Sequence, residues 1–170
     1  MTSEPANGIG SYDPRTWKLR TFYDHRQNFL EGRDTPRDYL ERCLEIIERL
    51  ETEVKAWAYL NTDAARKAAD ESTERYKAGK PLSLVDGMPI GIKDLIETAD
   101  MPTEYNSDLF RGNQPIRDAA SVYFLRKGGA IIIGKTVTIT FGGGDPAETR
   151  NPFDLRRTPG GSSSGTCAGV

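Results

Sequence analysis

Apolar side chains in the first half of the chain recur at intervals of three and four residues, the pattern of a helix with one buried face. The clearest such stripe is formed by Leu40, Cys43, Leu44, Ile47 and Leu50. This spacing predicts a helix that packs the apolar face against the rest of the chain. We therefore expect the Cys43 thiol to lie in the core.

The sequence also marks where helices start and stop. Thr35 can cap a helix that begins at Pro36, and Asp38 stands where the acidic residue of a capping box belongs. A second helix is predicted from about Thr62 to Gly79, because this stretch is rich in alanine and ends at a glycine. The many charges of the second helix are expected on a solvated face.

The pattern changes in the second half of the chain, where apolar runs become short and β-branched. Residues 88–93 and 130–134 are predicted strands, and residues 118–127 are a predicted helix capped by Asp118. Residues 137–141 fit either a short strand or a turn. Because strands and helices alternate, the pattern predicts an α/β fold with helices packed on a sheet.

Composition and charge narrow the possible functions. The 170-residue chain is 36% hydrophobic and 28% charged with a net charge of −2, so it lacks the basic surface that attracts nucleic acid or anionic membranes. No apolar run is long enough to span a membrane, and residues 1–11 are expected to form a flexible lead-in without a signal segment. Cys43 and Cys167 do not make a disulfide framework. We therefore expect a cytoplasmic protein.

The chain contains a single histidine, His25. It lies in a polar, helix-like stretch, where a solvated side chain is the expected role. A serine–histidine–aspartate triad would have to use this residue, and a zinc site built from several histidines has too few of them. Nucleophilic chemistry in this chain therefore needs a base other than histidine, and we expect no metal site.

One motif in the sequence is misleading. Residues 129–136 match the spacing G-x-x-x-x-G-K-[ST] of a phosphate-binding P-loop. Three of the four intervening residues are isoleucines, which favour an extended chain, and the Val-Thr-Ile-Thr-Phe that follows is a poor helix start. A P-loop leads directly into a helix. We therefore predict a buried strand ending in a turn, and no nucleotide site.

Two segments carry candidate chemistry. In residues 86–94 a lysine follows apolar residues of a predicted strand, and a buried lysine can lose its proton and act as a base. The alternative is an exposed lysine beside Asp94. In residues 158–166 three serines follow Pro-Gly-Gly, and the glycines allow the backbone amides of such a turn to point at an oxyanion. The alternative is a flexible Gly/Ser linker.

Together, and in this order, the segments resemble the amidase signature family. The shared features are Gly-Met-Pro-Ile-Gly-Ile-Lys-Asp, Gly-Gly-Ala-Ile-Ile-Ile-Gly-Lys-Thr, Asn151-Pro152 and Gly-Gly-Ser-Ser-Ser-Gly, and the likeness runs from about Tyr12 onward. The resemblance implies an α/β fold whose mixed sheet has helices on both faces, incomplete in this chain. It implies a helical N-terminal region over residues 12–80 and the start of the catalytic core over residues 81–170.

The resemblance also implies roles for two residues. Lys93 matches the family's general base and acid, and Ser162 matches a serine on a cis peptide bond that relays the proton to a nucleophilic serine. Ser163 and Ser164 are less favoured alternatives for this relay. The nucleophile and the oxyanion hole belong to a second Gly-Gly-Ser segment, which this sequence does not contain. We therefore expect the chain to end before the nucleophile and to be inactive by itself.

The remaining implications concern substrate and partners. Gly142, Gly143 and Gly144 match a stretch that often lines the substrate pocket of the family, although an ordinary turn is the alternative. The resemblance implies neither a metal nor an organic cofactor. The expected substrate is a small-molecule amide, and a homodimer is one option for the full-length protein.

Three functions fit these observations. The favoured one is an amidase that hydrolyses carbon–nitrogen amide bonds, and the second is a glutamine-dependent amidotransferase subunit that passes ammonia to a substrate held by a partner. The third is a non-catalytic binding or assembly module. In that case strands such as residues 130–134 would lack neighbours and leave edges prone to aggregation.

Overall fold

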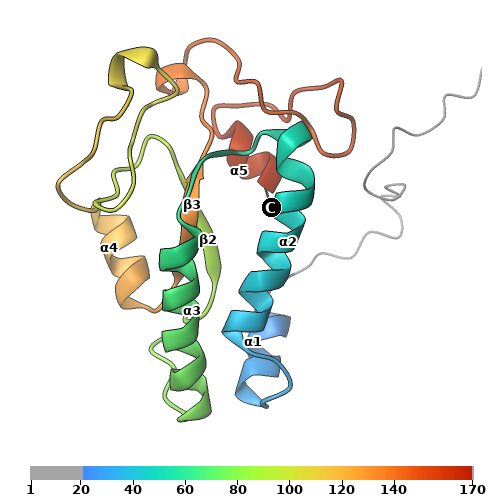
Figure 1. Ribbon diagram of the computed structural model, residues 1–170, viewed down its shortest axis with the longest axis vertical. Coiled ribbons are helices and arrows are strands. Elements are labelled where there is room, and N and C mark those ends of the chain that lie inside the picture. The colour runs from blue at the N-terminus through green and yellow to red at the C-terminus, as the bar shows by residue number, and fades with distance from the viewer. Residues whose placement is uncertain (1–20, 170) are drawn as a thin grey trace, which may run out of the picture.

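The computed structural model describes residues 21–169. Figure 1 shows how helices and strands follow one another along this part of the chain. The helices are α1 (Phe22–Leu30), α2 (Pro36–Val54), α3 (Thr62–Lys77), α4 (Ala120–Lys127) and α5 (Ser164–Gly169). The strands are β1 (Trp57–Leu60), β2 (Pro89–Lys93) and β3 (Ile131–Thr136), and short 3-10 turns cover Asp108–Phe110 and Thr140–Gly142. The predicted lead-in at residues 1–11 and the first part of the predicted helical region, residues 12–20, lie outside the described residues.

The strands form one mixed sheet in the order β1–β3–β2. Strand β1 runs antiparallel to β3, and β2 runs parallel to it. In this register Lys93, the last residue of β2, lies opposite Thr136, the last residue of β3. The carboxyl ends of the two parallel strands therefore meet at one edge of the sheet, where α/β proteins commonly bind their ligands.

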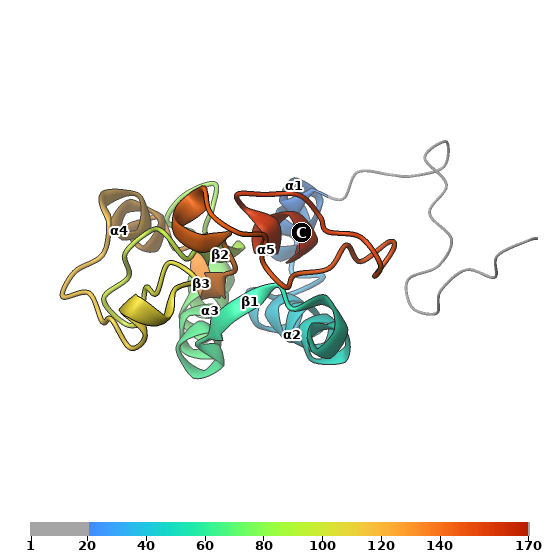
Figure 2. The ribbon, with the colours of Figure 1, turned by 90° about the horizontal axis from the view of Figure 1, so that it is seen from above.

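Helices cover both faces of this sheet, which confirms the predicted α/β arrangement. Ile131 and Ile133 of β3 pack in one cluster with residues of α2 and α3, whereas Ile132 packs in another with Val122 of α4. Because successive side chains of a strand point to opposite faces, the isoleucine run fills two cores at once. Figures 1 and 2 show α2 and α3 side by side, with α4 beyond the strands.

The predicted start of α2 is confirmed. The Thr35 hydroxyl accepts the Asp38 N–H at 3.0 Å and donates to the Asp38 carboxylate at 2.7 Å. Pro36 is the first helical residue, where its missing N–H costs no hydrogen bond. The second predicted helix is confirmed as α3, which ends at Lys77, two residues before Gly79.

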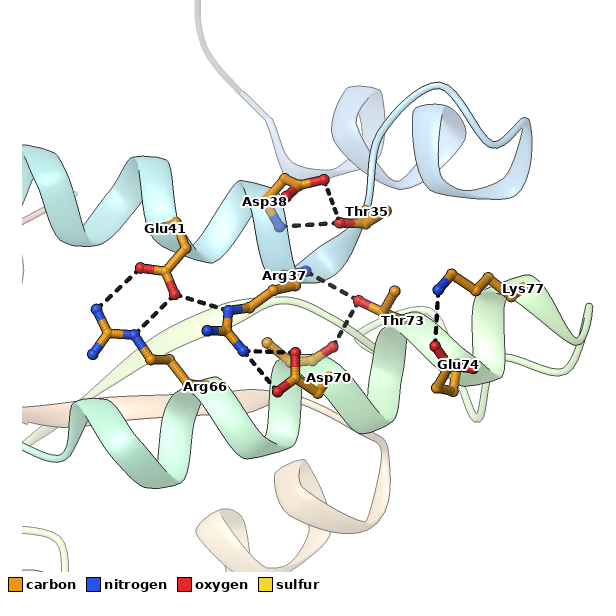
Figure 3. A network of polar contacts seen from close by, with 10 residues as sticks. Thr35, Arg37, Asp38, Glu41, Arg66, Asp70, Thr73, Glu74 and Lys77 are labelled. Carbon is orange, nitrogen blue, oxygen red and sulfur yellow. Dashed lines mark hydrogen bonds and ion pairs between the residues drawn. The ribbon is translucent and has the colours of Figure 1, made fainter.

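Polar contacts align α2 with α3 on their solvent side (Figure 3). Arg37 of α2 lies 2.6 Å from Asp70 of α3, and Arg66 of α3 lies 2.8 Å from Glu41 of α2. The Glu41 carboxylate also accepts a hydrogen bond from the Arg37 Nε–H at 2.8 Å. The hydrogen bond from Arg66, helped by that from Arg37, lowers the pKa of Glu41 against the opposing effect of lost hydration. Some of the expected solvated charges of the second helix thus form ion pairs with α2.

The predicted cap of the helix at residues 118–127 is wrong. The observed helix α4 begins at Ala120, and its capping residue, Ala119, makes no side-chain hydrogen bond. The Asp118 carboxylate instead accepts the Ala99 N–H at 2.8 Å and the Arg126 Nε–H at 3.0 Å. A charged guanidinium and a loop amide offer this carboxylate better donors than the first turn of its own helix does.

Two further details differ from the sequence-based picture, and one alternative that the sequence left open is decided. Strand β1 was not predicted, and it supplies the antiparallel neighbour of β3. Residues 137–141 form no strand and lead into the turn Thr140–Gly142, which settles the alternative left open there. Cys43 is half-buried, because Leu40 and Leu44 hold the centre of the buried face of α2.

Residues 21–169 contain neither a candidate membrane span nor a candidate metal cluster. No helix in this range is long and apolar enough to cross a membrane. No group of three or more histidine, cysteine, aspartate or glutamate side chains gathers there as a set of metal ligands.

Candidate active site

The stretch that imitates a P-loop is a buried strand, as predicted. All six residues of β3 are buried, and a Cβ atom on Gly134 would lie 2.2 Å from the Tyr59 carbonyl oxygen of the neighbouring strand. The glycine therefore allows two strands to approach, which is a structural task. Lys135, the lysine of the motif, donates to the Thr103 hydroxyl and the Pro102 carbonyl inside the protein. It does not reach towards a phosphate site.

The structure brings Lys93 and Ser162 together. The Lys93 Nζ atom lies 2.6 Å from the Ser162 Oγ atom, although 69 positions separate the two residues in the chain. Both side chains are half-buried, so solvent-borne molecules can approach them. The exposed-lysine and flexible-linker alternatives therefore do not describe these two segments. The peptide bond between Gly161 and Ser162 is cis.

Two hydrogen bonds hold the Ser162 carbonyl group. Its oxygen accepts the Ile139 N–H at 3.1 Å and the Thr138 hydroxyl at 3.0 Å. Both donors lie directly after β3, so the end of this strand fixes the backbone of Ser162 while its hydroxyl faces Lys93 of the neighbouring strand. Neither Thr138 nor Ile139 was identified as a site residue from the sequence.

Helix α5 is anchored to the same strand ends. The Gly165 N–H donates to the Val137 carbonyl at 2.8 Å, and the hydroxyls of Thr136 and Thr166 lie 2.8 Å apart. A Cβ atom on Gly165 would lie 2.2 Å from the Ala56 carbonyl oxygen. Only glycine permits this approach, which holds the start of α5 against the chain just before β1 and just after β3.

A buried ion pair lies directly behind Lys93. The Lys135 Nζ atom is 3.2 Å from the Asp94 Oδ1 atom, and the side chains are 0% and 3% exposed. Burial lowers the pKa of Lys135, while the Asp94 carboxylate opposes that shift. Asp94 also accepts the Glu104 N–H at 3.2 Å. The pair therefore ties the end of β2 to β3 and to the loop around Thr103.

An open hollow of about 490 Å³ has residues from the surroundings of the site in its wall, although Lys93 and Ser162 are not among its lining residues. Its wall contains Asp94, the residue after Lys93, and Thr138, the donor to the Ser162 carbonyl. The other lining residues are Ala58, Glu104, Asn106, Ser107, Asp108, Arg111, Val137 and Thr140. The lining is mainly polar.

The glycine triplet lies near this hollow without lining it. Gly142 donates its N–H to the Ile139 carbonyl, and Gly143 and Gly144 donate theirs to the Thr140 carbonyl at 3.1 and 2.7 Å. All three amides are therefore used inside the turn itself. The role of the triplet in substrate binding stays a prediction.

Within residues 21–169, the hydrogen bond of the Lys93 amine goes to Ser162 and not to the alternative relay serines, Ser163 and Ser164. The Ser163 carbonyl accepts the Cys167 N–H at 2.9 Å, and the buried Ser164 hydroxyl has no hydrogen-bond partner within the described part of the chain. The geometry therefore favours Ser162 among the three serines.

Comparisons with known proteins show which family the chain resembles. Residues 38–170 match the Amidase family. Among curated proteins, a glutamyl-tRNA(Gln) amidotransferase subunit of Chloroflexus aggregans is 38% identical over 82% of this chain and 30% of its own length. The corresponding amidotransferase subunit of Leptospira interrogans is 34% identical over 89% of this chain and 32% of its own length. The chain thus spans about a third of the length of these relatives.

Solved structures show the same fold. The peptide amidase of Stenotrophomonas maltophilia superposes with a TM-score of 0.83 at 28% identity, covering 92% of this chain and 35% of that one. A bacterial aryl acylamidase of the amidase signature family superposes with a TM-score of 0.70 at 28% identity, covering 84% and 31%. The chain therefore belongs to the amidase signature family.

Proposed function

We propose that the whole protein cleaves carbon–nitrogen amide bonds, with Lys93 as the base and Ser162 as the proton relay. The observation that carries this proposal is the distance of 2.6 Å between Lys93 Nζ and Ser162 Oγ. The expected nucleophile is a serine of a second Gly-Gly-Ser segment outside these 170 residues, which contain one such segment at 160–162.

The reaction follows from the positions of the two side chains. The neutral amine of Lys93 accepts the Ser162 hydroxyl proton while the Ser162 oxygen takes the proton of the nucleophilic serine. The serine oxygen then attacks the amide carbonyl, and the proton returns through Ser162 to the departing amine. Water releases the acyl group by the same route in reverse.

Inactivity of the 170-residue chain towards amides is part of the proposal. An amide is cleaved only if its carbonyl oxygen is stabilised as it becomes negative. Near Ser162, the Ile139 and Gly165 amides already donate to protein carbonyls. We therefore place the oxyanion donors, like the nucleophile, in the second Gly-Gly-Ser segment.

The test is amide hydrolysis by the natural gene product and its variants. Lys93→Ala removes the base and should lower kcat by about a hundredfold or more, and Ser162→Ala should slow turnover strongly. Lys80→Ala is the matched control, because Lys80 is exposed and should leave the rate unchanged. Rates near that of the natural protein in both site variants rule out the assignment.

A second candidate function rests on the curated relatives. Two of them carry the description of an amidotransferase subunit, so the protein can instead release ammonia from glutamine for a substrate on partner subunits. The two functions differ in what they need. Glutamine hydrolysis that appears only with copurifying partner subunits favours the amidotransferase, and hydrolysis of other small amides by the isolated protein favours the amidase.

Three further proposals concern the substrate, the location and the assembly of the whole protein. They are a small-molecule amide as substrate, a cytoplasmic location, and a homodimer as one option for the whole protein. Sedimentation of the natural gene product tests the last of these, because a monomer at micromolar concentration contradicts it.

A further inference from the structure

Lys93 and Ser162 form a complete base-and-hydroxyl pair within this chain. Their separation of 2.6 Å is within the range over which an active-site base takes a proton from a nucleophile. Both side chains are half-buried and can be reached by a small molecule. In the proposed amide reaction Ser162 only passes a proton on, but its hydroxyl has the same activation that a nucleophile needs.

We propose that Ser162 of the 170-residue chain is itself acylated by activated aryl esters, with Lys93 as the base. This activity goes beyond the proposed amide hydrolysis, and it needs no residue outside the chain. The probe is para-nitrophenyl acetate, an ester with a small acyl group and a stable leaving group.

The chemical step balances with groups that are present. The Ser162 Oγ proton moves to the neutral Lys93 Nζ atom as the oxygen attacks the ester carbonyl carbon and forms the new C–O bond. The tetrahedral intermediate collapses, the bond to the phenolic oxygen breaks, and para-nitrophenolate leaves with the electron pair. The products are acetyl-Ser162, para-nitrophenolate and a Lys93 ammonium, which returns its proton to water.

The leaving group explains why an ester reacts where an amide does not. Para-nitrophenolate departs without a proton, whereas an amine must be protonated as it leaves. The weak oxyanion stabilisation around Ser162, where the Ile139 and Gly165 amides are already used, is enough only for an activated carbonyl. The same chain is therefore expected to react with the ester and not with amides.

Other nucleophiles near the site must be separated from Ser162. Cys167 is an exposed free thiol, and thiols react readily with activated esters. The experiment therefore uses a Cys167→Ser background. On this background Ser162→Ala removes the proposed acceptor and Lys93→Met removes the base. The matched control is Ser163→Ala, because Ser163 carries the next hydroxyl in the chain, whereas the Lys93 amine bonds to Ser162.

The readout is intact mass followed by peptide mapping, with circular dichroism as the measure of folding. We expect one acetyl group per chain, on Ser162, and a burst of one equivalent of nitrophenolate. The labelling rate should fall by about a hundredfold in Lys93→Met, the usual contribution of a positioned base. Ser162→Ala should abolish the burst, and Ser163→Ala should leave it unchanged.

Several results overturn the proposal. Acetyl on Lys93 or Ser163 in place of Ser162 does so, as does an equal rate in Lys93→Met. A chain without a helical circular dichroism signal also overturns it, because the proposal is that this chain by itself holds the pair together. The proposed amidase is judged separately: amide turnover of the natural protein that is lost in Lys93→Ala supports it even if Ser162 is never acetylated here.

Discussion

Replacing Lys135 by methionine tests how much the buried ion pair between Lys135 and Asp94 contributes to the stability of the fold. Methionine keeps most of the volume of the lysine stem and removes only the ammonium. The Lys135 and Asp94 side chains are 0% and 3% exposed, so the variant leaves the Asp94 carboxylate buried without its cation. Its remaining donor is the Glu104 N–H.

The expected loss of stability is large. Removing one partner of a buried ion pair costs about 3–5 kcal/mol, which is a substantial part of the roughly 5–15 kcal/mol that stabilises an ordinary domain. The variant also deprives the Thr103 hydroxyl and the Pro102 carbonyl of their Lys135 donor. We therefore expect the urea midpoint to fall sharply while the slope of the transition stays the same.

The matched control is Lys77→Met on the surface of α3. Lys77 pairs with Glu74 at 2.9 Å, with its side chain 63% exposed, and Figure 3 shows the two side chains joined on α3. An exposed pair of this kind contributes about 0.5 kcal/mol or less. The same chemical change should therefore lower the stability very little at Lys77 and strongly at Lys135.

A further variant separates the loss of the pair from the loss of packing. If the penalty in Lys135→Met comes from the unpaired carboxylate, adding Asp94→Asn should cost much less than the sum of the single changes. A Lys135→Met chain whose stability is within about 0.5 kcal/mol of the unchanged protein would refute the reasoning. It would mean that Asp94 finds another partner or takes up a proton.

Two further predictions concern a close approach and a buried carboxylate. Gly134→Ala should lower stability by about 1–3 kcal/mol, because its Cβ would lie 2.2 Å from the Tyr59 carbonyl oxygen. The control is Gly143→Ala, whose Cβ would meet nothing within 4 Å. Equal urea midpoints for the two variants would contradict this prediction. Burial raises the pKa of Asp86, but hydrogen bonds from Arg75, a backbone amide and a serine outweigh it and leave the pKa below the usual 3.8. The stability that ionised Asp86 adds is therefore fully present above its unfolded pKa and is lost as the pH falls through its lower pKa in the folded protein. Asp86→Asn should accordingly make the stability depend less steeply on pH in acid. An unchanged dependence of stability on pH would argue against this prediction.

Local signals in the sequence predicted much of the fold. The cap at Thr35 is confirmed because its donor, the Asp38 N–H, lies only three residues away. The strand at 130–134 is confirmed because an isoleucine run between glycines favours the extended state whatever its neighbours are. The same kind of reading was wrong for Asp118, since its carboxylate is taken by donors at Ala99 and Arg126. Which donor a carboxylate meets depends on packing.

In the candidate site, too, some residues were predicted from the sequence and others were not. Lys93 and Ser162 were identified from the motifs that contain them. The Gly-Gly-Ser segment can be recognised in the sequence without knowing which residue its serine contacts. Lys135 stood inside a recognised pattern, but its burial against Asp94 was not foreseen. Thr138 carried no signal at all, since a threonine after a strand is ordinary until its hydroxyl is seen to hold the Ser162 carbonyl.

Short-range patterns of residues were enough to predict the helix start near Thr35, the strand β3 and the family that the two motifs indicate. These features depend on residues a few positions apart, whose preferences act within a single turn or strand. Only the tertiary structure decided two further features. They are the contact of 2.6 Å between Lys93 and Ser162 and the burial of Lys135. The residues of each such contact lie tens of positions apart, and the sheet register and the glycine contacts that bring them together arise only when the whole chain packs.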